Sequence, residues 1–386
     1  MYPIKTYNKI SKIGLDNFDA KYEIGDDVAN PVGAIVRSAA LHEEQFDDSL
    51  LAIARAGAGT NNIPIERCTD DGIVVFNTPG ANANAVKELV LAGLLISSRR
   101  ILPAIEWAKT LKGNGDQVGK MVEKGKSAFV GPEIRGKKLG VIGLGAIGVL
   151  VANAANQLGM KVYGYDPYLS LQNAWNLSHH IIRANDIKEI FENCDYISLH
   201  IPLNNDTKNT IDANALSLMK DGVRILNFSR DALVNSTDMI VALEQGKVAT
   251  YVVDFPTDEM IGVNGVICIP HLGASTPESE DNCAEMAAKQ LIDYIENGNI
   301  NNSVNLPNIS MPRSGDKRIC IIHKNIPNML TSITGIVAKD NVNIENLLNK
   351  SRGDVAYTML DVNECDTQSV ENHITAIDGV IKVRII

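Results

Sequence analysis

Residues 140–168 read GVIGLGAIGVLVANAANQLGMKVYGYDPY and combine a strand, a turn and a helix. The stretch begins as an apolar strand and breaks at Gly143, Gly145 and Gly148. Apolar residues then recur at helical spacing, and a second strand pattern ends at Asp166. This order predicts a βαβ unit, in which two parallel strands share one sheet.

The three glycines suit a turn that binds phosphate. Gly143 allows a tight turn, Gly145 lets a pyrophosphate approach the backbone, and Gly148 lets the helix pack against the strand. The amino terminus of the helix offers free N–H groups to the phosphates. Asp166 lies 18 residues after Gly148, where a carboxylate accepts hydrogen bonds from a ribose 2′-hydroxyl and repels a 2′-phosphate. We therefore predict that this domain binds NAD rather than NADP.

Alternating strand and helix patterns extend on both sides of this unit. Short β-rich runs from about residue 33 (VGAIVRS, SLLAIARAG, GIVVFNTP) precede one long helical pattern over about residues 82–107. After a lysine-rich segment, six strand patterns between residues 138 and 271 predict a doubly wound, Rossmann-type α/β domain. Beyond the polar stretch at residues 297–316, the order βαββαβ predicts a small ferredoxin-like module.

Composition narrows the function classes. The net charge of −10 disfavours nucleic acid and anionic membranes as partners, although a cleft with a few arginines still accepts a small anion. The six cysteines are widely spaced, with no CxxC and no histidine cluster, so neither a metal site nor a disulfide framework is expected. The amino terminus lacks a signal-peptide pattern, and the apolar run at residues 89–96 is too short to span a bilayer. These features favour a cytoplasmic enzyme or binding protein.

Polar residues follow three successive strand patterns of the middle domain. Arg230 follows VRILNFS, Asp254, Asp258 and Glu259 follow ATYVV, and His271 follows VICIP. Ligands of doubly wound sheets bind at the carboxyl ends of the strands, so these residues are the catalytic candidates. A histidine moves the proton of a substrate hydroxyl, a carboxylate orients the imidazole, and an arginine binds a substrate carboxylate.

Five motifs, VIGLGAIG, LHIPL, NFSRDALV, VVDFPTDE and IPHLGAST, together resemble the D-isomer-specific 2-hydroxyacid dehydrogenase family. The last module resembles the ACT domain, which occurs in only part of that family. The resemblance implies a discontinuous, flavodoxin-like substrate-binding domain at residues 1–95 and 275–302 and an NAD-binding domain at 96–274. It also implies a linker at 303–317 and an ACT regulatory domain at 318–386.

The resemblance assigns catalytic roles to three residues. Arg230 matches the arginine that binds substrate, His271 the acid/base, and Glu259 the acid that supports the histidine. The spacing from the preceding aspartate favours Glu259, whereas alignment on FPT selects Asp258, and both remain open. Asp231 stands where the family usually has glycine and adds a negative charge near an anion site.

Further contacts follow from the same resemblance. Arg37, in IVRSAAL, matches the arginine that meets the substrate phosphate. Lys126 either reaches a phosphate across a dimer or is a solvated lysine. The implied cofactor contacts, besides the three glycines and Asp166, are Ala146, Ile147, Phe228, Ser229, Arg230, Asp254, His271, Leu272, Gly273 and Ala274.

The ACT-like module carries an expected effector site. His323 and Asn325 follow its first strand and Asn343 precedes the next, as in ACT domains that bind serine between paired modules. Asn328 stands where such loops usually have glycine. Serine, another effector or no effector remain open.

The expected function is NAD-dependent oxidation of 3-phospho-D-glycerate to 3-phosphohydroxypyruvate, the first step of L-serine biosynthesis, by a homodimer or homotetramer. One alternative is reduction of an unphosphorylated 2-oxo acid such as hydroxypyruvate or glyoxylate. A second alternative, from another class, is an NAD-sensing binding protein similar to transcriptional corepressors. A third is a regulatory subunit that senses amino acids, which the Arg/Glu/His set argues against.

Overall fold

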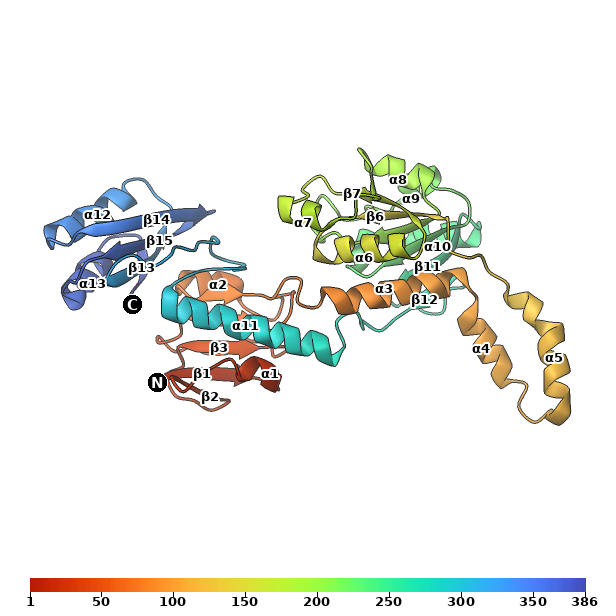
Figure 1. Cartoon of the computed structure of the whole chain (residues 1–386), viewed down its shortest axis with the longest axis horizontal. Helices are drawn as coiled ribbons and strands as arrows, with labels where there is room; N and C mark the ends of the chain where they lie inside the picture. Colours follow the sequence, from red (N-terminus) through yellow and green to blue (C-terminus); the bar gives the residue numbers. More distant parts are fainter. The chain divides into compact units, whose positions relative to one another are not determined.

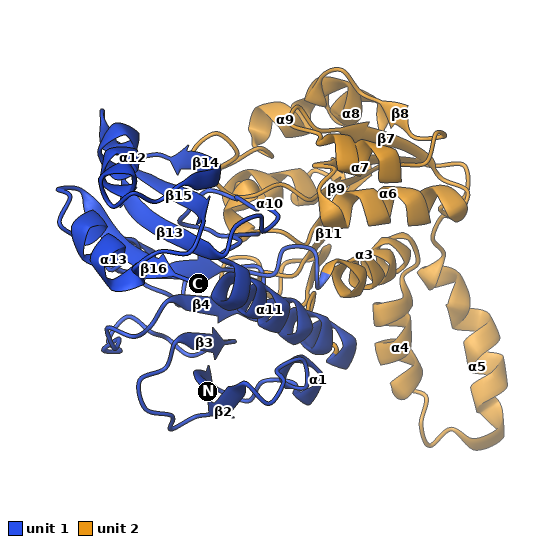
Figure 2. Cartoon of the chain, turned by 60° about the vertical axis from the view of Figure 1, so that its left-hand side comes forward, with its two compact units in different colours: residues 1–82, 277–386 blue, residues 83–276 orange.

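The computed structural model describes residues 1–386 (Figure 1). They form two compact units, which Figure 2 shows in different colours. The first unit contains residues 1–82 and 277–386, and the second contains residues 83–276. The first unit is therefore discontinuous in sequence. The family resemblance implies domain boundaries at 95/96 and 274/275, and the first of these lies within helix α3 (Ala83–Ser98).

The first unit contains a five-stranded parallel sheet of order β2-β1-β3-β4-β5. This is the flavodoxin-like order expected for the substrate-binding domain. Its elements are β1 (Tyr2–Tyr7), α1 (Lys12–Leu15), β2 (Tyr22–Gly25), β3 (Gly33–Val36), β4 (Ala52–Arg55), α2 (Ile65–Asp70), β5 (Val74–Phe76) and α11 (Pro277–Asn297).

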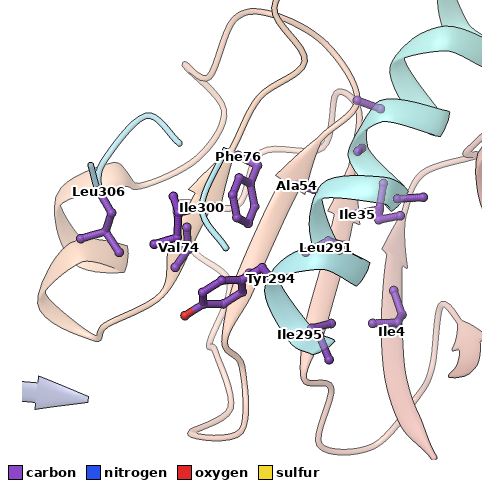
Figure 3. Close-up of a cluster of buried hydrophobic side chains, with 14 of the residues drawn as sticks. Ile4, Ile35, Ala54, Val74, Phe76, Leu291, Tyr294, Ile295, Ile300 and Leu306 are labelled. Atoms are coloured by element: carbon purple, nitrogen blue, oxygen red, sulfur yellow. The ribbon is translucent and has the colours of Figure 1, made fainter. Parts of the chain in front are cut away.

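Helix α11 covers this sheet because its apolar residues form one stripe. Ala284, Ala287, Leu291 and Ile295 recur every three or four residues and are buried. Figure 3 shows Leu291, Tyr294 and Ile295 of α11 beside side chains from β1, β3, β4 and β5. Residues from both ends of the sequence therefore share one core.

The second unit contains a seven-stranded parallel sheet of order β12-β11-β10-β9-β6-β7-β8. The sequence predicted six of these strands, and the two-residue β8 is the addition. The order is that of a Rossmann domain, which confirms the predicted fold class. The elements are α3, α4 (Ile101–Lys109), η1 (Gly115–Gln117), α5 (Val118–Gly125), η2 (Lys126–Phe129), β6 (Lys138–Ile142), α6 (Ala146–Gln157), β7 (Lys161–Tyr165), α7 (Leu171–Asn176), β8 (Ile182–Arg183), α8 (Ile187–Asn193), β9 (Tyr196–Leu199), α9 (Ala213–Leu218), β10 (Val223–Asn227), η3 (Asp231–Leu233), α10 (Ser236–Glu244), β11 (Val248–Val253) and β12 (Val266–Cys268).

The single long helix predicted over residues 82–107 is wrong, because the chain forms α3 and α4 with a break at residues 99–100. Pro103 is the third residue of α4. A proline lacks the N–H that would bond to the carbonyl four residues earlier, and its ring clashes with that carbonyl. A continuous helix through Arg99 is therefore disfavoured, and a new helix begins at Ile101.

The last seventy residues form the predicted βαββαβ module, with a four-stranded antiparallel sheet of order β14-β15-β13-β16. Successive residues of β13 point to opposite faces. Ile319 and Ile321 join a core with helices α12 and α13, whereas Cys320 and Ile322 join the core of the α11 sheet. The elements are β13 (Lys317–Lys324), α12 (Met329–Lys339), β14 (Ile344–Arg352), β15 (Val355–Val362), α13 (Thr367–Thr375) and β16 (Val380–Ile385).

The segment expected to be a linker, residues 303–317, is part of the first unit and packs against its five-stranded sheet. Leu306, Ile309 and Met311 are buried in its core. The Asn305 amide donates to the Ile73 carbonyl at 2.9 Å, and its oxygen accepts from the Val75 N–H at 2.9 Å. Although the segment is polar in composition, it is therefore an ordered part of the unit, and its Asn305 side chain hydrogen-bonds to the backbone at the edge of the sheet.

Candidate active site

The glycine turn after β6 has the geometry that its sequence predicts. Gly143 has φ +91°, and a Cβ there would lie 2.4 Å from the carbonyl oxygen of His200. A Cβ at Gly148 would lie 1.9 Å from the carbonyl oxygen of Gly143, so the helix approaches the turn too closely for any side chain. A Cβ at Gly145 would meet no atom within 4 Å. The turn therefore faces open space at Gly145, where a phosphate can approach the backbone.

The surroundings of this turn fit NAD. Gly145 is the N-cap of α6 and supplies no side-chain cap, so the first N–H groups of the helix, beginning at Ala146 and Ile147, are available to an anion. Asp166 follows β7, and its carboxylate accepts the Leu144 N–H and the Tyr168 N–H, both at 2.8 Å. A cavity of ≈ 520 Å³ opens beside this carboxylate. It lies at the strand end where the adenosine ribose is expected.

Arg230, Asp254 and His271 follow β10, β11 and β12, which are neighbours in the sheet. Their strand ends therefore lie at one edge, as the sequence predicts. The backbone there is held by Asn227, a buried residue whose amide donates to the Arg230 carbonyl at 2.8 Å. The Asn227 carbonyl accepts the Asp254 N–H at 3.0 Å.

Asp254 fixes the backbone on the far side of His271. Asp254 is 1% exposed, and its carboxylate accepts the N–H groups of Leu272 and Gly273, each at 2.8 Å. Burial raises the pKa of this carboxyl above its ordinary value, although the two N–H donors oppose the rise. His271 itself adopts a left-handed conformation with φ +53°, which is uncommon outside glycine. The backbone of His271 is thus held in an unusual conformation by a buried acid.

The side chains of Arg230 and His271 meet the same aromatic ring. The Phe255 and His271 ring centroids are 4.4 Å apart, and the Arg230 guanidinium carbon lies 5.4 Å from the Phe255 centroid. The imidazole makes no hydrogen bond, and Arg230 Nη1 donates to the Ser229 carbonyl at 2.6 Å. The structure therefore brings together two of the three predicted catalytic side chains.

The third, Glu259, is exposed and makes no hydrogen bond to His271. The same holds for Asp258, so the choice between these acids stays a prediction. Met260, which follows them, is buried in the core beneath the sheet. Asp231 is exposed at the start of η3, and nothing in the structure explains its place there.

The remaining proposed cofactor contacts lie around these strand ends. Phe228 is buried, and Ser229 Oγ donates to the Leu199 carbonyl at 2.8 Å. Leu272 is exposed, whereas Gly273 is buried. Ala274 is half-buried in the turn that precedes α11.

Two arginines follow neighbouring strands of the first unit. Arg37, after β3, pairs with Glu280 of α11 at 2.5 Å. Arg55, the last residue of β4, donates from Nε to the Arg37 carbonyl at 3.2 Å. Lys126 lies in the second unit, exposed in η2, and pairs with Glu123 at 2.5 Å. Arg55 is therefore a second cation beside Arg37, and it was not among the predicted site residues.

The expected effector residues separate in the structure. His323 and Asn325 line a cavity of ≈ 220 Å³ at the amino end of α12, together with Asn349 of β14. His323 is 2% exposed, and its two ring nitrogens bond to the Lys324 carbonyl and the Thr358 hydroxyl, both at 2.8 Å. Asn343 does not line this cavity and donates to Glu345 at 2.8 Å.

Asn328, at the N-cap of α12, adopts a left-handed φ of +67°. Asparagine tolerates this conformation better than most residues, which accounts for its presence where glycine is usual.

Three residues that sequence reasoning missed lie at these sites. Arg55 and Phe255 each follow or end a strand beside a predicted residue, so the rule that located Arg230 would also have found them. Asn349 lies within a strand, and only its pairing with the neighbouring strand places it at the cavity. No group of three or more histidine, cysteine, aspartate or glutamate side chains is arranged to hold a metal, and no helix is both long and apolar enough to cross a membrane.

Comparison with known proteins matches the family models of two domains. Residues 92–273 match the NAD-binding domain of D-isomer-specific 2-hydroxyacid dehydrogenases, and residues 319–382 match the AHAS small subunit-like ACT domain. The chain is 34% identical to the D-3-phosphoglycerate dehydrogenase of Escherichia coli K12 over 355 residues, which cover 88% of this chain and 82% of the relative. It is 31% identical to that of Haemophilus influenzae, covering 87% and 81%.

A NAD⁺-bound 3-phosphoglycerate dehydrogenase from Entamoeba histolytica has a similar structure. The TM-score is 0.58 at 26% identity, with 79% of this chain and 98% of the other covered. The glycine turn with Asp166 and the matched nucleotide domain make the chain an NAD-dependent oxidoreductase. The chain belongs to the D-isomer-specific 2-hydroxyacid dehydrogenase family, among its D-3-phosphoglycerate dehydrogenases.

Proposed function

We propose that this enzyme oxidises the C2 hydroxyl of 3-phospho-D-glycerate to the ketone of 3-phosphohydroxypyruvate. The observation that carries the proposal is the placement of Arg230 after β10 and His271 after β12, at the same sheet edge on either side of β11, in a domain of the NAD-binding type. Relatives named D-3-phosphoglycerate dehydrogenase support the choice of substrate.

The chemistry divides between the cofactor and two side chains. Bound NAD supplies the acceptor for the hydride that leaves C2. His271 takes the hydroxyl proton, so that the C–H and O–H bonds are both broken and a C=O double bond forms. Arg230 binds the substrate carboxylate with two N–H donors and orients C2. Glu259 is proposed to support the imidazolium, with Asp258 as the alternative.

Arg37 and Arg55 are proposed to bind the substrate phosphate, because planar guanidinium groups suit phosphate oxygens. The ion pair between Arg37 and Glu280 is part of this site. Phosphate has to replace the Glu280 carboxylate as the partner of Arg37. The Arg37 and Glu280 side chains are 43% and 42% exposed, so solvent can hydrate the Glu280 carboxylate when phosphate replaces it. Lys126 remains a proposed additional phosphate contact.

Replacing Arg37 with alanine tests the phosphate role. Hydrogen bonds to charged groups contribute about 1.5–3 kcal/mol, so kcat/KM for 3-phosphohydroxypyruvate is expected to fall about 10- to 150-fold. Reduction of hydroxypyruvate, which has no phosphate, is expected to change less than about 2-fold. The measurement is NADH absorbance at 340 nm with each substrate.

Lys289→Ala is the matched control, because it removes an exposed cation of α11 that pairs with Glu285. Equal losses with both substrates in Arg37→Ala would remove the phosphate role. Wild-type turnover of hydroxypyruvate alone would support the unphosphorylated alternative. An absence of turnover with any 2-hydroxy acid would support a binding protein.

We also propose that the ACT domain binds L-serine at the cavity beside α12. Asparagine amides supply donors and acceptors for the ammonium and carboxylate of an amino acid. Asn325 and Asn349 line that cavity, and Asn343 is proposed to contribute to it from a paired module. Inhibition requires that serine bind one state of the enzyme more tightly than another.

Millimolar L-serine is expected to suppress oxidation of 3-phosphoglycerate. Asn325→Ala is expected to raise the serine concentration for half-inhibition about 10-fold or more, because bonds to a charged ligand are lost. Asn346→Ala, on β14 but outside the cavity, is the control. Inhibition that is unchanged in Asn325→Ala would place the effector elsewhere, and no response of the wild type would remove serine as effector.

We further propose a cytoplasmic location and a homodimeric or homotetrameric assembly. All six cysteines are free, which is usual for reducing compartments. The net charge of −10 favours a small-molecule partner over nucleic acid or membrane. Light scattering of the full chain with NAD tests the assembly, and a monomer would contradict it.

A further inference from the structure

The side chains of Arg230 and His271 have few other partners. His271 is exposed and its imidazole makes no hydrogen bond. The guanidinium of Arg230 bonds only to the neighbouring Ser229 carbonyl. What both groups contact is the Phe255 ring, at 4.4 Å for the imidazole centroid and 5.4 Å for the guanidinium carbon.

The backbone of all three residues is fixed by buried polar groups. Asn227 bonds to the Arg230 carbonyl and to the Asp254 N–H, directly before Phe255. Asp254 bonds to the two N–H groups directly after His271. These contacts fix the Cα positions and leave the side-chain torsions of Arg230 and His271 free. Apart from the bond of Arg230 to the Ser229 carbonyl, the contacts with the Phe255 ring are therefore what orients the functional atoms.

We propose that Phe255 is a positioning residue that holds the Arg230 guanidinium and the His271 imidazole at the separation the reaction needs. The inference rests on the proposed function, which gives those two groups their tasks.

The aromatic ring suits this task for two reasons. Phenylalanine has two side-chain torsions, so little freedom is lost when its ring is ordered. The negative face of the ring attracts cations, so it holds the guanidinium, and its attraction for the imidazole increases when His271 takes the substrate proton. An aliphatic side chain fills similar space but offers neither a flat surface nor a quadrupole.

Phe255→Leu and Phe255→Tyr test the proposal in the full-length enzyme. In Phe255→Leu, kcat for 3-phosphoglycerate is expected to fall about 10- to 100-fold, because small misplacements of catalytic groups reduce rates on this scale. KM is expected to rise by a smaller factor, and the Kd for NAD, measured by fluorescence titration, is expected to stay within about 2-fold. Phe255→Tyr keeps the ring and is expected to retain kcat within about 3-fold.

A double-mutant cycle separates positioning from packing. In a His271→Asn background the Phe255→Leu change is expected to cost a smaller factor, because one of the two groups it orients is gone. Phe191→Leu is the control, since Phe191 lies buried in α8 among other apolar residues. It is expected to lower the melting temperature and leave kcat unchanged.

Three outcomes would overturn the proposal. The first is full activity of Phe255→Leu while His271→Asn is inactive. The second is an equal loss of kcat from Phe255→Leu in the wild-type and His271→Asn backgrounds. The third is a loss of kcat in Phe255→Tyr equal to that in Phe255→Leu. If Phe255→Leu does not fold, Phe255→Met provides the same comparison. Failure of the proposed function is distinct, because the wild type itself would then not oxidise 3-phosphoglycerate.

Discussion

Replacement of His271 by asparagine is expected to lower kcat for 3-phosphoglycerate oxidation about 10²- to 10⁴-fold, the usual contribution of a positioned acid or base. Asparagine keeps a polar side chain and also tolerates the left-handed backbone seen at φ +53°. The substitution therefore removes the proton acceptor without forcing the turn to change. Alanine at this position would add backbone strain to the chemical loss.

NAD binding is expected to survive this change. The Leu272 and Gly273 N–H groups stay bonded to Asp254, and the glycine turn after β6 is remote in sequence from the substitution. The Kd for NAD is expected to remain within about 3-fold of the wild-type value, since no bond of the imidazole is lost. Steady-state rates and a fluorescence titration on the same preparation measure the two effects.

His179→Asn provides the matched control, because His179 is an exposed histidine of the same unit, and its ring contacts that of His180. Its kcat is expected to equal that of the wild type. A His271→Asn enzyme that keeps a tenth or more of the wild-type kcat would show that another group accepts the proton. A parallel loss of NAD binding would show that His271 acts mainly on the turn.

The nucleotide-binding turn was predictable because its requirements are local. Gly148 is needed because a side chain there would collide with the Gly143 carbonyl five residues earlier. Gly143 is needed because its φ of +91° favours glycine, so both requirements follow from the glycine spacing of the turn. The strand ends that carry Arg230 and His271 were predictable from the same alternation of strands and helices. The fold of this domain and the location of its candidate site could therefore be predicted together.

Contacts between side chains from different strands could not be predicted in the same way. Phe255 meets Arg230 and His271 because three strand ends adjoin, and the orientation of each ring depends on packing rather than on spacing. Whether an acid supports His271 depends on the path of residues 255–260. The spacing favours Glu259, but in the structure both Asp258 and Glu259 are exposed.

The polar stretch before the ACT domain shows a second limit of prediction from sequence, which concerns composition. Ser303 and Asn305 are buried and hydrogen-bonded to each other and to the edge of the sheet, so their polarity does not indicate a solvated linker. Apolar residues of this stretch occur too sparsely to reveal a period. The shared core of the ACT domain and the α11 sheet could therefore not be predicted from composition.

That shared core contains a buried ion pair with a large expected effect on stability. Arg318 and Asp361 have fully buried side chains, with bonds of 2.6 Å and 2.8 Å between the guanidinium and the carboxylate. Ser314 donates its N–H to the same carboxylate at 2.8 Å. Arg318 Nη1 donates to the Asn297 carbonyl at the end of α11, also at 2.8 Å. The pair thus joins two ACT strands, the preceding segment and α11.

Arg318→Met is expected to lower the free energy of unfolding by about 3–5 kcal/mol at pH 7, because it leaves the Asp361 carboxylate buried without its partner. A change of 1 kcal/mol shifts the melting temperature of a domain of this size by about 2–4 °C, so a fall of about 6–20 °C is expected. Lys317→Met, the preceding residue on β13, is the control and makes no ion pair. A fall below about 2 °C would contradict this account.

The contribution of this ion pair to stability is expected to depend on pH, in a direction that follows from the pKa of Asp361. Burial acts to raise the pKa of Asp361, but the donors from Arg318 and Ser314 outweigh it and hold the pKa below its ordinary value. The pair therefore stabilises the wild type above the unfolded pKa of about 4, and that contribution is lost as pH falls through the folded pKa. In Arg318→Met, protonation of the Asp361 carboxylate removes the buried, unpaired charge and so reduces the loss of stability. The difference in melting temperature between the wild type and Arg318→Met is expected to shrink from pH 7 toward pH 4. In the double variant Arg318→Met/Asp361→Leu no unpaired charge remains, so its melting temperature is expected to differ little from that of the wild type. A difference that stays constant with pH would show that lost packing, and not the stranded carboxylate, destabilises the variant.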